Sequence, residues 1–250
     1  MQRTGRASLF SAWTVSPGHQ RVLEASTNSH SDMLLDDNLE FIPAWIPPQE
    51  ADALFSRLLE RLPLKQESIV VAGRTVLQPR LTLWMGDPDA VYRYSGRTFV
   101  PVAWDDLVLE LRSRVERLAR CGFNSVLFNL YRNGQDSMGY HADDEPELRP
   151  KPTIASVSFG ATRQFKLKPR KKRFAPPAEL ALSHGSLLIM RGSTQEVFVH
   201  GVPKEPAVSD PRLNLTFRYV CAASVGDSAP TQVSRNSSNE STARGPRQHL

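Results

Sequence analysis

The sequence predicts an α+β domain in which helices come first and an antiparallel sheet system, in the form of a sandwich or barrel, follows. Two amphipathic segments with helical spacing lie before Gly122, and six short β-rich segments separated by Gly, Pro and Ser lie after it. The chain has 250 residues and is 40% hydrophobic, which suffices for one domain with a core, although the length also permits two small domains.

The two predicted helices each carry an apolar stripe. In 47–63, which has prolines at both ends, the stripe consists of Leu54, Leu58 and Leu62. In 104–122, where Gly122 is placed to end the helix, it consists of Leu107, Leu111, Val115 and Leu118. The predicted strands that follow are 125–131, 153–160, 163–168, 186–190, 196–202 and 212–220.

The two ends of the chain have the composition of disordered segments. Residues 1–38 are polar and show no sustained period, and residues 224–250 are rich in Ser, Asn, Pro and Arg. Neither end offers enough apolar side chains to form a core. We therefore expect the folded domain to occupy residues 39–223.

The charge and cysteine content of the chain indicate a cellular compartment but do not indicate a function. The net charge of +5 is compatible with an anionic partner but does not require one. Two cysteines are too few for a disulfide framework, and no apolar run is long enough for a membrane helix or a signal peptide. We expect a monomer that contacts no membrane and is cytoplasmic, associated with the nucleoid in a bacterium or nuclear in a eukaryote.

Polar residues share one face of the last predicted strand. Because side chains alternate across a strand, one face of 212–220 carries Arg212, Asn214, Thr216 and Arg218. Asn129 and Tyr131 lie together in the same way on 125–131. Two interpretations remain open. These faces are solvated outer surfaces, or they line a pocket that binds a carboxylate, because the guanidinium fork matches carboxylate geometry.

The segment GYHADDEPEL, residues 139–148, gathers acidic residues around one histidine. His141 and Asp143 share a face if the segment is extended, and His200 ends another predicted strand. A solvated acidic loop would explain the charges alone, whereas two histidines and one carboxylate form the facial triad of non-haem Fe(II) oxygenases. A His-x-Asp pair is common by chance, but the order of triad and polar strand residues along the chain favours the metal site.

Together these segments resemble the AlkB family of Fe(II)- and 2-oxoglutarate-dependent dioxygenases, in particular its animal DNA-repair homologues. The similarity runs from about Ile42 to Val220, and its motifs are FNSVLFNLYRNGQDSMGYHADDEPEL, PTIASVSFGATRQFKLK, LSHGSLLIMRG, the strand of His200 and PRLNLTFRYV. The resemblance implies a double-stranded β-helix, or jelly roll, preceded by helices and by a nucleotide-recognition lid at about 66–102.

The resemblance also implies the residues of an active site. The Fe(II) ligands, which are also the catalytic residues, would be His141, Asp143 and His200. The co-substrate 2-oxoglutarate, which is consumed with O2, would be hydrogen-bonded by Asn129 and Tyr131. Its distal carboxylate would pair with Arg218. The rest of that strand face would line the same site, with Arg212 as the second candidate for contact, followed by Asn214 and Thr216.

Within the lid, Tyr94 stands where the family places an aromatic side chain that stacks on a flipped base. Tyr92 and Arg80 would flank the same substrate pocket, although the two tyrosines could also be ordinary strand aromatics. Asp144 matches the family residue that contacts the exocyclic amine of the damaged base, and Glu145 would assist it.

The implied function is an oxidative demethylase that repairs N-alkylated bases in DNA, with RNA as an additional substrate to consider, and releases formaldehyde. N1-methyladenine and N3-methylcytosine are the expected substrates, because bases alkylated on the Watson–Crick edge cannot pair and flip out at lower cost. Two alternatives stay open: an oxygenase that acts on a protein, lipid or small molecule, and a non-catalytic β-domain that binds nucleic acid.

Two departures from the duplex-working branch of the family favour single-stranded DNA as the substrate. Ala72 occupies the hairpin position of a bulky aromatic wedge, and Lys204 and Glu205 stand where that branch has a basic run. Basic residues gather instead at 166–173, either in a solvated hairpin loop or in contact with phosphates.

Overall fold

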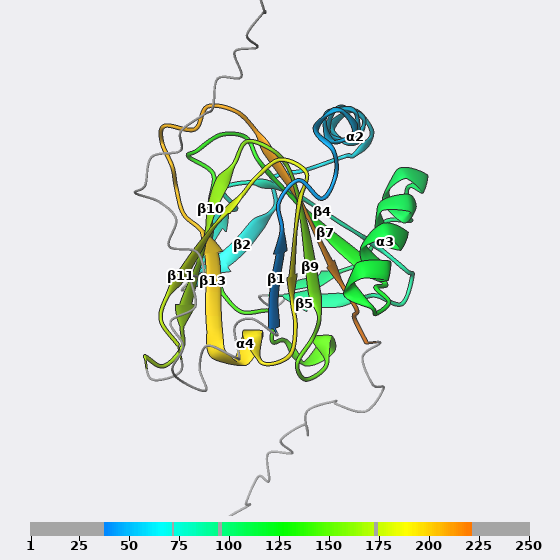
Figure 1. Cartoon of the computed structure of the whole chain (residues 1–250). Helices are drawn as coiled ribbons and strands as arrows, with labels where there is room; N and C mark the ends of the chain where they lie inside the picture. Colours follow the sequence, from blue (N-terminus) through cyan, green and yellow to red (C-terminus); the bar gives the residue numbers. More distant parts are fainter. Residues whose placement is uncertain (1–37, 72, 95–96, 173–174, 222–250) are drawn as a thin grey trace, which may run out of the picture.

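The computed structural model describes residues 38–71, 73–94, 97–172 and 175–221, which are built around two antiparallel sheets (Figure 1). The larger sheet has the strand order β1 (Leu39–Ile42), β12 (Ser186–Met190), β9 (Ile154–Gly160), β14 (Arg212–Arg218), β7 (Ser125–Tyr131) and β4 (Leu81–Gly86). The smaller sheet has the order β11 (Ala178–Leu182), β10 (Arg163–Pro169), β13 (Phe198–Val202) and β8 (Met138–His141). Each of the six strands predicted after Gly122 is therefore present.

Helices α2 (Pro48–Arg61) and α3 (Asp106–Ala119) cover the outer face of the larger sheet (Figure 1). Leu58 and Leu111 from the predicted stripes are buried against sheet residues such as Phe128. Each apolar side chain of this size contributes about 1.5–3 kcal/mol by leaving water. Among the described residues, no helix is both long and apolar enough to cross a membrane.

The C-terminal end of α3 differs from the prediction in two respects. Arg120, not Gly122, takes the left-handed conformation, with φ 56°, and its backbone N–H donates to the carbonyl of Glu116. Leu118 is exposed rather than part of the buried stripe. The helix therefore stops before the glycine, and the stripe ends at Val115 and Ala119.

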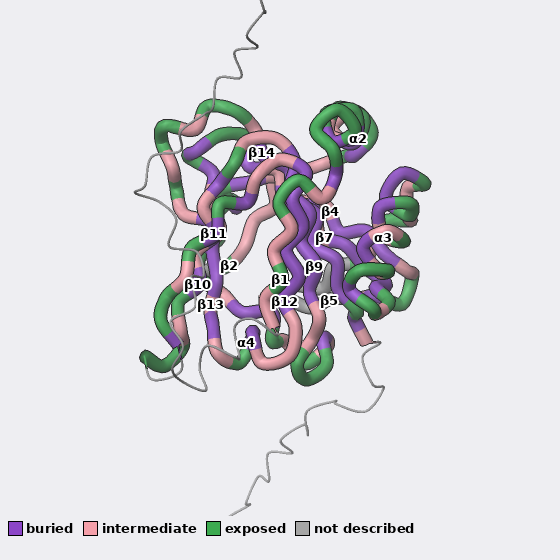
Figure 2. Tube along the Cα trace, in the orientation of Figure 1, coloured by how far each residue is buried: buried purple, intermediate pink, exposed green. Residues whose placement is uncertain are grey.

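The inner face of the larger sheet is also covered, because the smaller sheet packs against it (Figure 2). Tyr131 and Ile154 from the larger sheet form one apolar cluster with Phe165 and Phe198 from the smaller. A strand in the middle of the larger sheet, such as β14, therefore has no face exposed to water. The short helix α4 (Thr194–Val197) precedes β13 and replaces the first residues of the strand predicted at 196–202.

The stretch predicted as a lid contains two hairpins on either side of β4 in the chain. They are formed by β2 (Ser68–Val71) with β3 (Arg74–Leu77) and by β5 (Tyr92–Tyr94) with β6 (Arg97–Phe99). A bridge between Lys65 and Thr82 ties the start of the first hairpin to β4. Ala72, the predicted wedge position, lies outside the described residues. So do the termini predicted to be disordered, except Asn38.

A buried arginine joins the loop between β7 and β8 to the loop between β13 and β14. Arg163 is 1% exposed and pairs with Glu205 at 3.0 Å. Its guanidinium also donates to the backbone carbonyls of Asn133, Asp136 and Pro203. The loops approach so closely at Gly134 that a Cβ there would lie 1.7 Å from the carbonyl oxygen of Glu205. Only a glycine fits this approach without moving backbone.

Gly134→Ala is therefore expected to lower the free energy of unfolding by at least ~2 kcal/mol, because the clash is with backbone rather than with a side chain that can turn away. Urea unfolding followed by circular dichroism would measure this. Gly122→Ala is the matched control, since a Cβ there has its nearest neighbour 3.9 Å away. Equal stability of the two variants would contradict the close packing of the loops.

Candidate active site

The polar face of β14 points into the sandwich. Arg212, Asn214, Thr216 and Arg218 are each no more than 8% exposed. Tyr131 and Asn129 of β7 lie directly opposite Arg212 and Asn214 in the antiparallel register. The interpretation of these faces as solvated outer surfaces is therefore wrong, because their side chains line an interior pocket.

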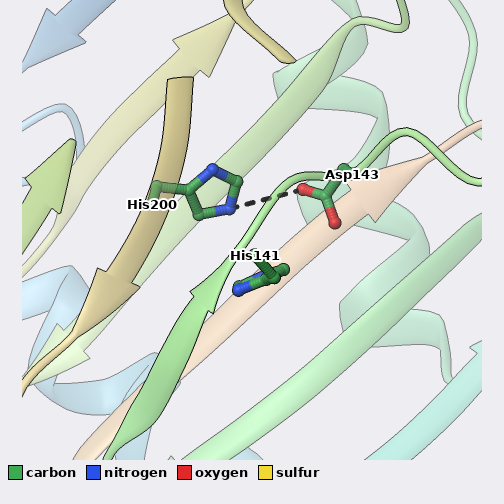
Figure 3. A group of neighbouring side chains, drawn as sticks. All are labelled: His141, Asp143 and His200. Carbon is green, nitrogen blue, oxygen red and sulfur yellow. Dashed lines mark ion pairs between the residues drawn. The ribbon is translucent and has the colours of Figure 1, made fainter. Parts of the chain in front are cut away.

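Sheet pairing assembles the three candidate metal ligands (Figure 3). His141 ends β8 and lies directly opposite His200 of β13, so the two side chains share one face. Asp143 follows two residues later, and its Oδ2 lies 3.7 Å from Nε2 of His200. One potential ligand atom from each of the three residues lies within 4.8 Å of the others.

The atoms of this cluster that have no hydrogen-bond partner among the described residues could bind a divalent cation. Oδ2 of Asp143 is buried and has no hydrogen-bond partner among the described residues. Nδ1 of His141 lies 3.0 Å from the carbonyl oxygen of Gly139, which places the ring proton on Nδ1 and leaves a lone pair on Nε2. Two imidazoles and one carboxylate on one side of an ion match the ligand set of non-haem Fe(II).

Electrostatics and burial keep Asp143 and His200 in the protonation states that can bind a metal. Burial by itself would raise the pKa of Asp143, but Arg218 and the two histidines outweigh it and hold that pKa at about 2. Burial, assisted by His141, lowers the pKa of His200 to about 3. At neutral pH the carboxylate is therefore ionised and the imidazole of His200 is neutral.

Arg218 orients the carboxylate of Asp143, the candidate metal ligand. Its Nη2 donates to Oδ1 of Asp143 at 2.7 Å, and both side chains are buried. The backbone N–H of Asp143 donates to Oε1 of Gln195 in α4 at 3.0 Å. These contacts fix one carboxylate oxygen and leave the other directed to the two histidines.

Arg212 has free donors in the same interior. It is 1% exposed, and its Nη2 donates to Oγ of Ser158 at 2.9 Å. Nε and Nη1 have no acceptor in the described part of the chain, and the guanidinium carbon lies 5.3 Å from the centre of the Tyr131 ring. Close by, Nδ2 of Asn214 donates to Oγ of Ser156, and the hydroxyl of Thr216 donates to Oδ1 of Asn214.

A cavity of about 280 Å³ opens beside the metal ligands. His141, Asp143 and Arg218 border it on one side, and Arg80 and Glu145 also line it. Nε of Arg80 donates to Oδ1 of Asn129 at 2.7 Å, so this cavity and the polar face of β7 are linked. Tyr92 and Tyr94 belong to β5, but their side chains lie outside what the structure describes.

Asp144 and Glu145 have different surroundings. Asp144 is exposed, forms an ion pair with Arg170, and is not among the residues that line the cavity. Glu145 lines the cavity, and its buried Oε2 has no hydrogen-bond partner among the described residues. The basic segment 166–173 begins within β10, where Lys166 bonds to Glu179 of the neighbouring strand β11.

The sequence reasoning missed Ser156, Ser158 and Gln195. The two serines are two residues apart on β9 and bond to Asn214 and Arg212, so strand alternation could have found them. Gln195 lies on a four-residue helix and had no pattern to reveal it.

Comparisons with known proteins agree with this geometry. A family model described as the 2OG-Fe(II) oxygenase superfamily matches residues 38–218. The alpha-ketoglutarate-dependent dioxygenase alkB homolog 3 of Bos taurus is 44% identical over 191 residues, which cover 71% of this chain and 64% of the relative. The DNA oxidative demethylase ALKBH2 of Arabidopsis thaliana is 36% identical over 225 residues, covering 78% and 72%.

The solved structure of OsALKBH1 superposes with a TM-score of 0.54 at 15% identity, covering 73% of this chain and 96% of that one. This likeness supports the predicted jelly-roll fold. The chain spans 64% of the length of the first mammalian relatives. The matches to the family model and to ALKBH2 each extend over most of the described domain. The chain belongs to the 2OG-Fe(II) oxygenase superfamily and, within it, to the AlkB family.

Proposed function

We propose that this chain is an oxidative demethylase that removes methyl groups from the Watson–Crick edge of bases in DNA. The observation that carries the proposal is the position of the His141–Asp143–His200 cluster. It lies between a buried arginine with free donors and a cavity large enough to admit a base. The names of the relatives, which describe DNA demethylation and alpha-ketoglutarate-dependent oxidation, support it.

His141, Asp143 and His200 would hold Fe(II), and their unpartnered atoms fit it. When bound, the iron supplies the activation of O2 that couples oxidation of the methyl group to decarboxylation of 2-oxoglutarate. Arg218 orients the carboxylate of Asp143, so that one oxygen stays free for the metal. Hydroxylation of an N-methyl group gives an unstable hydroxymethyl group, which leaves as formaldehyde and restores the base.

Arg212 is better placed than Arg218 to pair with the distal carboxylate of 2-oxoglutarate. Arg218 already bonds to Asp143, whereas Arg212 has two donor atoms without an acceptor and lies beside Tyr131. Its charge is buried, and an uncompensated buried charge is costly. Asn129, Asn214 and Thr216 complete the polar lining between Arg212 and the metal ligands.

Glu145 is better placed than Asp144 to contact the base. Its free oxygen lines the cavity, whereas the carboxylate of Asp144 is committed to Arg170. N1-methyladenine and N3-methylcytosine are cationic and carry an exocyclic amine, so both suit the free carboxylate oxygen of Glu145 in this cavity.

Formaldehyde release tests the proposal directly. The protein would be incubated with Fe(II), 2-oxoglutarate and single-stranded oligonucleotides that carry N1-methyladenine, N3-methylcytosine or no lesion. Formaldehyde from the two methylated strands, and only when 2-oxoglutarate is present, is the expected result. Binding of the strands without turnover would favour a non-catalytic nucleic-acid-binding domain. Consumption of 2-oxoglutarate with a methylated peptide instead would favour a protein substrate.

Replacing a metal ligand should abolish turnover while the fold persists. Asp143→Ala and His141→Ala are each expected to remove more than 99% of formaldehyde release and to lower the bound iron, measured by elemental analysis; this corresponds to about 2.7 kcal/mol or more. Asp144→Ala is the control, since it changes the adjacent carboxylate that lies outside the cavity. Near-native turnover of Asp143→Ala with unchanged iron content would refute the ligand assignment.

Arg212→Lys should raise the 2-oxoglutarate concentration at half-maximal rate by tenfold or more, because an ammonium group cannot replace the guanidinium fork. Arg218→Lys should instead weaken iron binding, because Arg218 acts on Asp143. Titration of each variant with 2-oxoglutarate and, separately, with Fe(II) distinguishes them. If Arg218→Lys alone raised the 2-oxoglutarate requirement, the original expectation for Arg218 would be correct.

We also propose that single-stranded DNA is the preferred substrate, since Ala72 is too small to fill the gap that a flipped base leaves in a duplex. The wild type is expected to act faster on N1-methyladenine in single strands than in duplex at matched salt. Ala72→Phe should improve only the duplex rate. Equal wild-type rates on both substrates would show that another side chain supplies the wedge.

A further inference from the structure

Gln78 is a buried amide that the active site described above does not use. It lies between β3 and β4, is 5% exposed, and its Oε1 accepts no hydrogen bond from the described part of the chain. Its backbone is fixed on both sides: the N–H donates to the carbonyl of Glu67, and the carbonyl accepts from Nε2 of Gln66, both at 2.8 Å. These two hydrogen bonds fix the backbone of Gln78, while its buried side-chain oxygen receives no hydrogen bond from the described residues.

Gln78 lines the same cavity of about 280 Å³ that reaches His141 and Asp143. Apart from the metal-ligand oxygen of Asp143, the buried side-chain oxygens without a partner in the described residues are those of Gln78 and Glu145. Both line this cavity. A pocket that presents two free acceptors selects a ligand that brings N–H donors, because a buried acceptor left unpaired is costly.

We propose that Gln78 is a specificity-determining residue, whose side-chain oxygen accepts a hydrogen bond from the exocyclic amine of the base in this cavity. The inference rests on the proposed demethylase function. The amine of adenine or cytosine brings two N–H donors. The carbonyl oxygen that thymine carries at the same position would bring a further acceptor against Gln78 and Glu145. Gln78 thereby favours methylated cytosine over methylated thymine.

The test uses two single-stranded oligonucleotides that differ only in carrying N3-methylcytosine or N3-methylthymine. For Gln78→Leu, kcat/KM on N3-methylcytosine should fall about tenfold, equivalent to ~1.4 kcal/mol, while the value on N3-methylthymine stays equal or rises. Gln78→Glu, which can only accept at that position, should keep the wild-type preference. Gln135→Leu makes the same change at an exposed position outside the cavity and should leave the ratio unchanged.

A second measurement does not depend on turnover. Fluorescence anisotropy of the same labelled strands with metal-free protein should show the same loss of preference in Gln78→Leu. An equal loss on both lesions would make Gln78 merely structural and overturn the proposal, as would a Gln78→Glu variant that behaves like Gln78→Leu. If the wild type neither demethylates the lesions nor distinguishes them from an unmodified strand, the proposed function itself fails and takes this inference with it.

Discussion

The buried ion pair between Arg218 and Asp143 is the contact on which the rest of the site depends. Arg218 sits on a central strand whose two faces are both covered, so its charge has no route to water. An uncompensated charge there would be costly, and Asp143 compensates it. The same contact keeps the pKa of Asp143 low against the effect of burial. The arrangement of strands thus dictates a carboxylate that is ionised and oriented before any metal binds.

The positive charge of Arg212, which remains after Arg218 pairs with Asp143, indicates that the interior suits an anionic ligand. With Asp143 matched to Arg218 and His200 neutral, Nε and Nη1 of the buried Arg212 guanidinium have no acceptor among the described residues. A divalent cation at the triad would add positive charge to the same space. A ligand with two carboxylates, one for Arg212 and one near the metal, would offset most of this positive charge, and this is the charge pattern of 2-oxoglutarate.

Strand alternation in the sequence was enough to group Arg212, Asn214, Thr216 and Arg218 on one face, and the His-x-Asp spacing with His200 was enough to propose the triad. Alternation could not tell which face is the inner one, since that depends on the sheet that packs against it. Nor could it separate the roles of Arg212 and Arg218, because two residues of one face look alike until their neighbours from other elements are known.

The roles of Asp144 and Glu145 could not be separated from the sequence either, although the two residues are neighbours in the chain. They are adjacent in sequence, and family resemblance favoured Asp144 for the base. What separates them is where the chain goes after the metal ligand: the carboxylate of Asp144 meets Arg170 at the end of β10, whereas that of Glu145 turns into the cavity. Arg170 is brought there by the pairing of β10 with β13, the strand that also carries His200. The pairing that completes the candidate metal site therefore also places Arg170 against Asp144, and Glu145 is left with a free acceptor that faces the cavity.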